Sequence, residues 1–343
     1  MPLILLIVKI YIKILISKVY KLTMKILAIQ NRMGIGDTVI FLPFIKAISD
    51  MFNSPVSLLV KENSKANEFL NETNYIDEII HLKRNNKNKD RHDGFLGFFK
   101  LANDINKYNF EKVFIFNSSL RFNLICKLAK IKKIYQYPLF KKKNQHLINA
   151  AKTFINKELD LKVDSNPLIN LEDSLIQNAK KKYKINDKQT NIVVGIGGSG
   201  PTKRIPAEKF ILFMHMVIDK FDCRFFLATG KNNEEQLILN QIMQSEFKDR
   251  CEPLDNKNLD EILPIIKNCK IAICNDSSFS HLSAALNIPT IVLMADTPLL
   301  YGNYSPRMHP IIPDGEETVG HNTLGKDRIN PEKIYNKFLE ILY

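Results

Sequence analysis

The sequence predicts an α/β protein made of two Rossmann-like domains that face each other across a cleft. Short apolar runs that suit buried strands alternate with helical segments in both halves of the chain, which is typical of parallel sheets covered by helices. Each half opens with a strand that runs into a glycine-rich turn, at 34–36 and at 195–200. The length of 343 residues also exceeds that of one ordinary domain.

The first half contains four apolar runs bounded by turn-forming residues. We expect strands at 25–30, 56–60, 76–82 and 112–116, with helical segments between them. The polar stretch 83–94 predicts a loop. We therefore expect the first domain at 24–165, followed by a linker at 166–190 where the alternation blurs.

The second half repeats this alternation. We expect the following strands and helices in this half: strands at 191–196, 223–229, 270–274 and 290–294, and helices at 206–220, 234–246, 258–268 and 279–286. The second domain is expected at 191–328. A last helix at 331–342, within the segment 329–343, closes the chain.

The first 23 residues, MPLILLIVKIYIKILISKVYKLT, contain four lysines and no acid. The lysines interrupt each apolar run before it reaches the roughly 18 residues of a membrane-spanning helix. Two interpretations stay open. The segment 1–23 is a basic helix that lies on an anionic membrane, or Met24 is the true start of the protein.

Composition narrows the class of partner. Lysine and arginine outnumber aspartate and glutamate by 49 to 36, giving a net charge of +13. This excess favours an anionic partner such as a nucleotide, a phosphorylated lipid or a membrane surface, although a general bias towards lysine would also produce it. No nucleic-acid-binding motif occurs, which argues against nucleic acid. The five cysteines, without a CxxC pair, indicate a reducing compartment and neither a disulfide framework nor a zinc site.

The turn GIGGSG (195–200) formally matches the GxGxxG pattern of dinucleotide-binding folds. That pattern also needs an acid near the end of the next strand. The next strand ends in LATG, so a nicotinamide site is disfavoured. A glycine turn followed by cations suits a diphosphate, because backbone N–H groups approach its oxygens and the cations offset its charge. A plain strand-to-helix turn is the alternative. The candidate contacts are Gly198, Ser199, Lys203 and Arg204.

Two other turns place acids at the start of a helix. TGKNNEE (229–235) puts Glu234 or Glu235 in a first helical turn, where either could offset the helix dipole and where Glu234 could accept hydrogen bonds from ribose hydroxyls. NRMGIGDTV (31–39) does the same for Asp37, which could be an N-cap or a base that takes a proton from a substrate hydroxyl.

The stretch NDSSFSH (275–281) follows a buried strand directly. Asp276 or Ser277 could cap the helix expected near Phe279, but a cap accounts for one polar residue and not for a row of them. The N-terminus of such a helix also presents free N–H groups to an anion, and His281 lies in its first turn.

The order and spacing of these four motifs resemble glycosyltransferase family 9, which contains the ADP-heptose:lipopolysaccharide heptosyltransferases. The resemblance extends over about 24–340. It implies a GT-B fold with two Rossmann-like domains, whose final helix packs back towards the first domain. It also implies metal-independent transfer from a nucleotide-sugar, and no D-x-D pair occurs in the sequence.

The resemblance assigns roles to three of the charged residues. Asp37 matches the catalytic base of the family. Lys203 matches the lysine that binds the donor phosphates, and Glu234 matches the acid that contacts the ribose.

The last motif also matches the family position by position. Asp276 matches an acid near the transferred sugar. Ser277 and Ser278 match a Thr-Gly pair whose backbone meets the diphosphate, and His281 matches the histidine that follows.

The chain departs from the family pattern at three places. Ile205 stands where a tryptophan is usual, Ser278 where a glycine is usual, and ADT (295–297) where GPT is usual. Lys257 falls in the segment that tends to line the base. These departures concern the identity of the nucleotide and sugar more than the class of reaction.

The resemblance thus implies an inverting glycosyltransferase without metal or cofactor. It would move a heptose-like sugar, from ADP-heptose or a similar donor, to a lipopolysaccharide or other lipid-linked glycan. A sugar-nucleotide epimerase of the same fold and a nucleotide-sugar-binding protein without catalysis stay open as alternatives. The basic composition favours a place in the cytoplasm, at the inner face of the cytoplasmic membrane.

Overall fold

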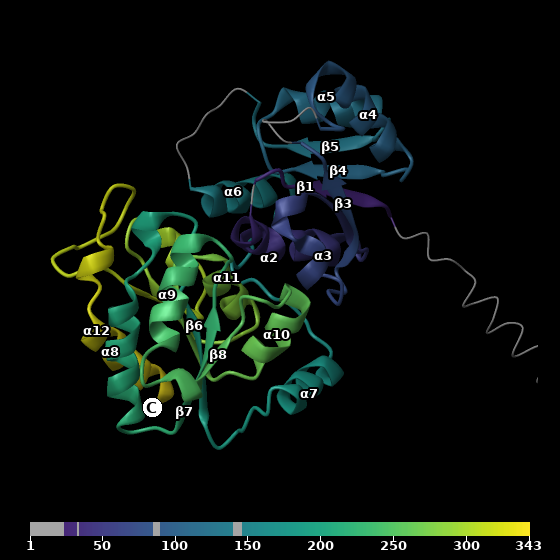
Figure 1. Ribbon diagram of the computed structural model, residues 1–343. Helices are drawn as coiled ribbons and strands as arrows, with labels where there is room; N and C mark the ends of the chain where they lie inside the picture. Colours follow the sequence, from purple (N-terminus) through teal and green to yellow (C-terminus); the bar gives the residue numbers. More distant parts are fainter. Residues whose placement is uncertain (1–23, 33, 85–89, 140–145) are drawn as a thin grey trace, which may run out of the picture.

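A computed structural model describes residues 24–32, 34–84, 90–139 and 146–343. The segment 1–23, and with it both interpretations of that segment, lies outside these ranges. The described chain forms two parallel sheets with helices on both faces of each (Figure 1). Within the described ranges, no helix is both long enough and apolar enough to cross a membrane.

The first sheet has the strand order β3-β2-β1-β4-β5, and all neighbouring strands are parallel. Its strands are β1 (Ile26–Ile29), β2 (Val56–Lys61), β3 (Ile76–Leu82), β4 (Lys112–Ile115) and β5 (Lys133–Gln136). The helices of this half are α2 (Ile35–Phe52), α3 (Ala66–Phe69), α4 (Gly94–Asn106), α5 (Leu120–Leu128) and α6 (Leu147–Leu159).

Strand β1 lies at the centre of this sheet and is buried on both faces. Side chains alternate across a strand. Accordingly, Leu27 and Ile29 join the buried cluster that includes the inner residues of α4 and α5. Ile26 and Ala28 join the cluster on the opposite face, which includes those of α2 and α6. This continuous apolar run is what a central parallel strand requires.

The second sheet has the order β11-β10-β9-β6-β7-β8, again with every pair parallel. Its strands are β6 (Thr190–Gly195), β7 (Cys223–Ala228), β8 (Cys251–Pro253), β9 (Ile271–Asn275), β10 (Thr290–Leu293) and β11 (Met308–Ile311). The helices are α7 (Asp173–Lys182), α8 (Ala207–Ile218), α9 (Asn233–Met243), α10 (Leu259–Lys267), α11 (Ser278–Ala285) and α12 (Pro331–Leu342).

Each strand and helix that was predicted with a residue range is present with closely similar bounds. The sequence did not indicate β5, β8 and β11. The strands β5 and β8 are short and only partly buried, and both lie at a sheet edge, so neither carries a continuous apolar run. The linker region contains α7, which packs against α10.

The prediction for the packing of the final helix was wrong. We expected the segment 329–343 to pack back towards the first domain, but α12 packs against α8, β10 and β11 of the second half. Its apolar stripe carries Ile334 and Phe338, which are buried there, and the ring of Phe338 lies 5.7 Å from that of Phe213 in α8.

The two halves meet where α2 packs against α11. One buried cluster contains apolar residues of both helices. Near the start of α2, Gly36 lies against the ring of His281 in the first turn of α11, and a Cβ atom at Gly36 would be 2.5 Å from His281 Cδ2. Real carbon atoms do not approach so closely, so only glycine lets these two helices come together.

We predict that Gly36→Ala lowers the free energy of unfolding by ~1–3 kcal/mol, because the added methyl group must push α2 away from the His281 ring. Gly320→Ala is the matched control, since nothing lies within 4 Å of a Cβ built there. Its effect should stay within about 0.5 kcal/mol. Denaturant unfolding of the two variants measures the difference, and equal stabilities would contradict this account of the interface.

Candidate functional site

A cleft with a volume of about 910 Å³ lies between the two halves and is lined by residues of both. The turn after β1 and the start of α2 contribute from the first half. The turns after β6, β7 and β9 contribute from the second. In both sheets these turns follow the carboxyl ends of the strands, where open α/β sheets bind their ligands.

Asp37 lies at the lip of the cleft in the first turn of α2. Gly34 precedes the helix with a φ of 107°, a backbone conformation that favours glycine. Since Gly34 is the N-cap, Asp37 is not the capping residue. Burial raises the pKa of Asp37 above its usual value, although the positive charges of Arg32 and Lys203 oppose the shift. Lys203 belongs to the second half, so the two halves share an electrostatic environment here.

Lys203 and Asp276 form an ion pair on the second side of the cleft. Lys203 Nζ lies 2.8 Å from Asp276 Oδ2. Burial alone would raise the pKa of Asp276, but the positive charge of Lys203 holds it below its usual value. The carboxylate therefore stays ionised, and the ammonium group of Lys203 is fixed at the opening of the turn that follows β9.

The start of α11 lacks a side-chain cap. Ser277 is the N-cap residue, but its side chain makes no capping hydrogen bond, and no partner for Ser277 Oγ is found among the described residues. The hydroxyl of Ser280 donates instead to the Ser277 carbonyl, at 2.7 Å. The N-terminus of α11 therefore faces the cleft, lined by Ser277 and Ser278, with positive dipole potential for an anion.

His281 is held in a neutral form in this first turn. Its Nδ1 lies 2.8 Å from the hydroxyl oxygen of Tyr304. Burial lowers the pKa of His281 to about 4. At neutral pH the imidazole thus adds no charge, and it serves as the surface against which Gly36 packs.

The glycine turn after β6 is held in place by two polar side chains. Asn275 Nδ2 donates to the Ile196 carbonyl at 2.8 Å, and the N–H of Gly198 donates to Glu235 Oε1 at 2.7 Å. Gly198 and Ser199 line the cleft. Arg204 also lines the cleft and supports the turn by donating from Nε to the Gly198 carbonyl at 3.0 Å.

The two adjacent glutamates of α9 lie in different surroundings. Glu235 is buried and lines the cleft. Glu234, which the sequence analysis favoured for the ribose, is not among the residues that line the cleft, and its exposed carboxylate pairs with Arg204. The N-cap Asn232 accepts from the N–H of Glu235, which starts the helix so that Glu235 points inwards.

Two of the residues that depart from the family pattern, Ile205 and Asp296, have structural roles. Ile205 is fully buried in the core of the second half. Asp296 accepts a hydrogen bond from the N–H of Leu324 at 2.9 Å and so anchors a distant loop. Lys257 lines the cleft, but its ammonium group donates to the Pro253 carbonyl at 3.1 Å.

Arg32 and Tyr301 line the cleft, and the sequence assigned no role to either. Arg32 lies in the quoted motif NRMGIGDTV, and its Nη1 is 4.0 Å from Asp37 Oδ1. Tyr301 lines the cleft from a segment without any recognisable motif, so no signal in the sequence could have found it.

Comparison with known proteins agrees with this geometry. The model of glycosyltransferase family 9 (heptosyltransferase) matches residues 99–319. The chain belongs to this family. A lipopolysaccharide heptosyltransferase 1 from Campylobacter coli is 27% identical over 177 residues, which cover 51% of each chain. A lipooligosaccharide heptosyltransferase 2 from Haemophilus influenzae is 30% identical over 116 residues, which cover 34% of this chain and 32% of the relative. The chain thus spans about half of the first relative and about a third of the second.

Solved structures extend the likeness over nearly the whole chain. The ADP-heptose lipopolysaccharide heptosyltransferase II of E. coli has a TM-score of 0.69 at 17% identity and covers 93% of this chain and 98% of its own. A family 9 glycosyltransferase from Veillonella parvula has a TM-score of 0.73 at 18% identity, with 93% and 97% covered. At these identities the likeness shows the fold, which is GT-B with two Rossmann-like domains.

We predict that Glu235→Gln weakens the binding of ADP by about tenfold or more, because a charged acceptor of hydrogen bonds is lost at the cleft floor. Glu234→Gln is the matched control on the next residue and should leave binding nearly unchanged. Inorganic diphosphate contains no ribose. If Glu235→Gln weakens the binding of ADP but not of diphosphate, the loss concerns the ribose and not the structure of the turn. Calorimetric titration of both variants with both ligands measures this, and a larger loss in Glu234→Gln would restore Glu234 as the contacting acid.

Proposed function

We propose that this protein is an inverting glycosyltransferase that moves a heptose from a nucleoside diphosphate donor to a lipid-linked glycan such as lipopolysaccharide, without a metal or cofactor. The observation that carries the proposal is the position of Asp37. It projects from the first half into the same cleft as Lys203, close enough for Lys203 to lower its pKa. A base and a phosphate-binding cation on opposite walls are what transfer between two bound substrates requires.

The second half supplies a binding site for the donor. Lys203 and the N-terminus of α11 would offset the charge that grows on the leaving diphosphate. Gly198 and Ser199 let its oxygens approach the backbone, with Arg204 supporting the turn. These groups provide the electrostatic stabilisation that a metal ion supplies in other enzymes. ADP-heptose is the donor we favour, since the family is that of the heptosyltransferases.

Asp37 would act as the general base on the acceptor. Its carboxylate takes the proton of the acceptor hydroxyl while that oxygen attacks the anomeric carbon, and the bond from this carbon to the diphosphate oxygen breaks. Attack from the face opposite the diphosphate inverts the anomeric centre. The raised pKa of Asp37 suits this role, because a base is most effective when its pKa approaches the working pH.

We place this reaction in the cytoplasm, at the inner face of the cytoplasmic membrane. The five cysteines are free thiols in the structure, in keeping with a reducing compartment. The net charge of +13 favours phosphorylated acceptors in an anionic membrane leaflet.

We predict that Asp37→Asn lowers the rate of heptose transfer from ADP-heptose to heptose-free lipopolysaccharide by at least about 100-fold, because the amide cannot accept the hydroxyl proton. ADP binding should persist. Asp50→Asn is the matched control, since Asp50 lies on the same helix, is exposed and pairs with Lys46. Full activity of Asp37→Asn would refute the assignment of Asp37 as the general base.

The same assay separates the alternatives. Conversion of the donor sugar without any acceptor would indicate an epimerase. Binding of ADP-heptose without transfer or conversion would indicate a protein that only binds the donor.

The pH dependence of transfer should follow the charge on Asp37. The base works when deprotonated, so kcat/KM should fall as the pH drops through its raised pKa. Arg32 lowers this pKa, so Arg32→Ala should raise it and move the acidic limb to higher pH. Lys46→Ala removes a cation from the same helix that pairs with Asp50 instead, and should leave the limb in place. An acidic limb that stays in place or moves to lower pH in Arg32→Ala would contradict the assignment.

A further inference from the structure

Helices α4 and α5 carry exposed apolar side chains on the first half. Phe95 and Leu96 are the most exposed of them, at 77% and 72%. The two helices pack against each other, and Figure 1 shows them together on the side of the first sheet that faces away from the second half. We call the set the α4–α5 surface: Phe95, Leu96, Phe99, Leu120, Leu124 and Leu128.

The members of this surface form continuous stripes. On α5 the three leucines are four residues apart, so they line one helix face. On α4 the rings of Phe95 and Phe99 are 5.1 Å apart. Arg121, at the start of α5, lies over the ring of Phe98 at 5.5 Å and links the two helices. An exposed apolar area of this kind is typical of an interaction site.

The charge around the surface is positive. Lys100 and Lys127 are exposed on the same two helices, and Lys130 follows directly. Helix α5 contains no acidic residue, and Asp104 is the acid of α4. A surface of exposed phenylalanine and leucine with interleaved lysine fits the interface of an anionic bilayer, where the apolar groups insert and the cations meet the headgroups.

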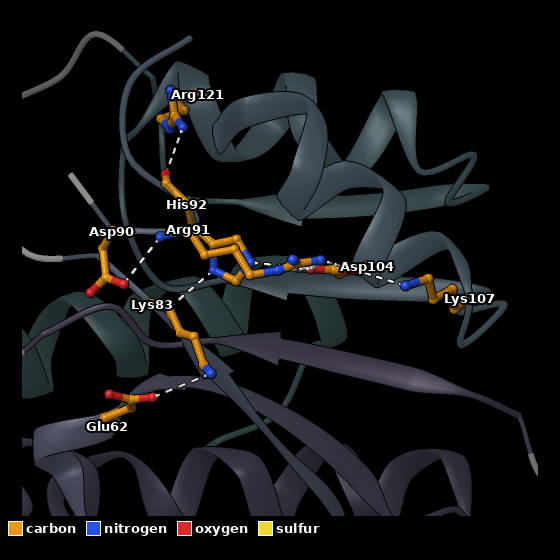
Figure 2. A network of polar contacts seen from close by, with 8 residues as sticks. All are labelled: Glu62, Lys83, Asp90, Arg91, His92, Asp104, Lys107 and Arg121. Carbon is orange, nitrogen blue, oxygen red and sulfur yellow. Dashed lines mark hydrogen bonds and ion pairs between the residues drawn. The ribbon is translucent and has the colours of Figure 1, made fainter. Parts of the chain in front are cut away.

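The charge of Asp104 is already balanced by its neighbours (Figure 2). It accepts hydrogen bonds from Arg91 at 2.8 Å, from Lys107 at 3.0 Å and from His92 at 3.2 Å. Burial opposes ionisation, but these hydrogen bonds hold the pKa of Asp104 at about 2. The carboxylate therefore adds no uncompensated negative charge beside the surface.

The same contacts fix the start of α4 in place. Arg121 donates to the carbonyl of His92 at 3.0 Å, and His92 Nδ1 accepts from the N–H of Lys83 at 3.0 Å (Figure 2). The backbone of His92 also packs so closely on Gly97 that a Cβ there would be 2.3 Å from the His92 carbonyl carbon. Phe95 and Leu96 are thus presented on a rigid base.

We propose that the α4–α5 surface docks this protein on an anionic lipid bilayer, with Phe95 and Leu96 inserted among the acyl chains. The inference rests on the proposed function in one respect, that the acceptor is anchored in such a bilayer. A second copy of the chain fits less well. A two-fold interface brings the same patch of each copy together, which would bring the lysines of both copies, Lys100 and Lys127 among them, into one interface.

A tryptophan reporter tests insertion directly, because the chain contains no tryptophan. In Phe95→Trp, vesicles of phosphatidylglycerol and phosphatidylethanolamine should shift the emission to shorter wavelength, and lipids with brominated acyl chains should quench it. Leu237→Trp is the matched control on α9 of the second half, where Leu237 is also exposed. It should show neither effect.

Two results in this assay would overturn the proposal. Vesicle-bound protein with unchanged Phe95→Trp emission would mean that another part of the chain makes the contact. Short-wavelength emission before any lipid is added would mean that the surface is covered by the chain itself or by a second copy.

Loss of the apolar groups should weaken binding. The double variant Phe95→Ser, Leu96→Ser should partition to the same vesicles at least about tenfold less, since the two apolar side chains that insert among the acyl chains are lost. Leu212→Ser with Leu237→Ser is the matched control and should bind normally. Lys100→Glu should cost at least about fivefold, from the loss of one cation at the membrane surface.

Transfer to a lipid-free acceptor oligosaccharide separates this inference from the proposed function. All of these variants should retain it. If the unmodified protein transfers no sugar to any acceptor, the proposed function fails whatever the vesicles show. If it transfers sugar and the Phe95→Ser, Leu96→Ser variant still binds vesicles normally, the inference of docking through the α4–α5 surface is wrong, whereas the proposed function stands.

Discussion

The contact between Gly36 and His281 sets how closely α2 and α11 approach each other where the two halves of this protein meet. Helix α2 begins beside the first turn of α11 only because no Cβ atom lies between the glycine and the imidazole ring. This contact brings Asp37 from one half within the electrostatic influence of Lys203 from the other. His281 suits the position because burial keeps it neutral, whereas a charged ring would repel the adjacent ammonium group. The close packing at Gly36 is therefore what brings the charged groups of the two halves near each other.

Two cations on the second side of the cleft are already paired. Lys203 pairs with Asp276, and Arg204 pairs with Glu234. Such pairing keeps long cationic side chains in place before a ligand arrives, which reduces the conformational entropy lost on binding. A diphosphate that approaches Lys203 must share it with a buried carboxylate. The uncapped N-terminus of α11 then provides the additional positive potential that Asp276 would otherwise offset.

The sequence predicted most of the buried strands and the glycine turns because these depend on local patterns. It favoured Glu234 over Glu235 for the ribose, but adjacent helical residues differ in direction by about 100°, and which of them faces the cleft depends on where the helix begins. The cap at Asn232 decides it. The final helix was misplaced for a related reason. An apolar stripe with Ile334 and Phe338 shows that one face is buried, but not against which half.

Strand β1 connects the two surfaces on which the proposals rest. Its side chains alternate, so Ile26 and Ala28 pack with α2, which carries Asp37, while Leu27 and Ile29 support the layer of α4 and α5. A bilayer contact on α4 and α5 would thus lie across a single sheet from Asp37, the proposed base. The glycan of a lipid-anchored acceptor would have to extend past the carboxyl edge of this sheet to reach Asp37. The thickness of the sheet and its helix layer would then set the least distance between the bilayer and the sugar that is modified, which favours an acceptor sugar held out from the membrane surface.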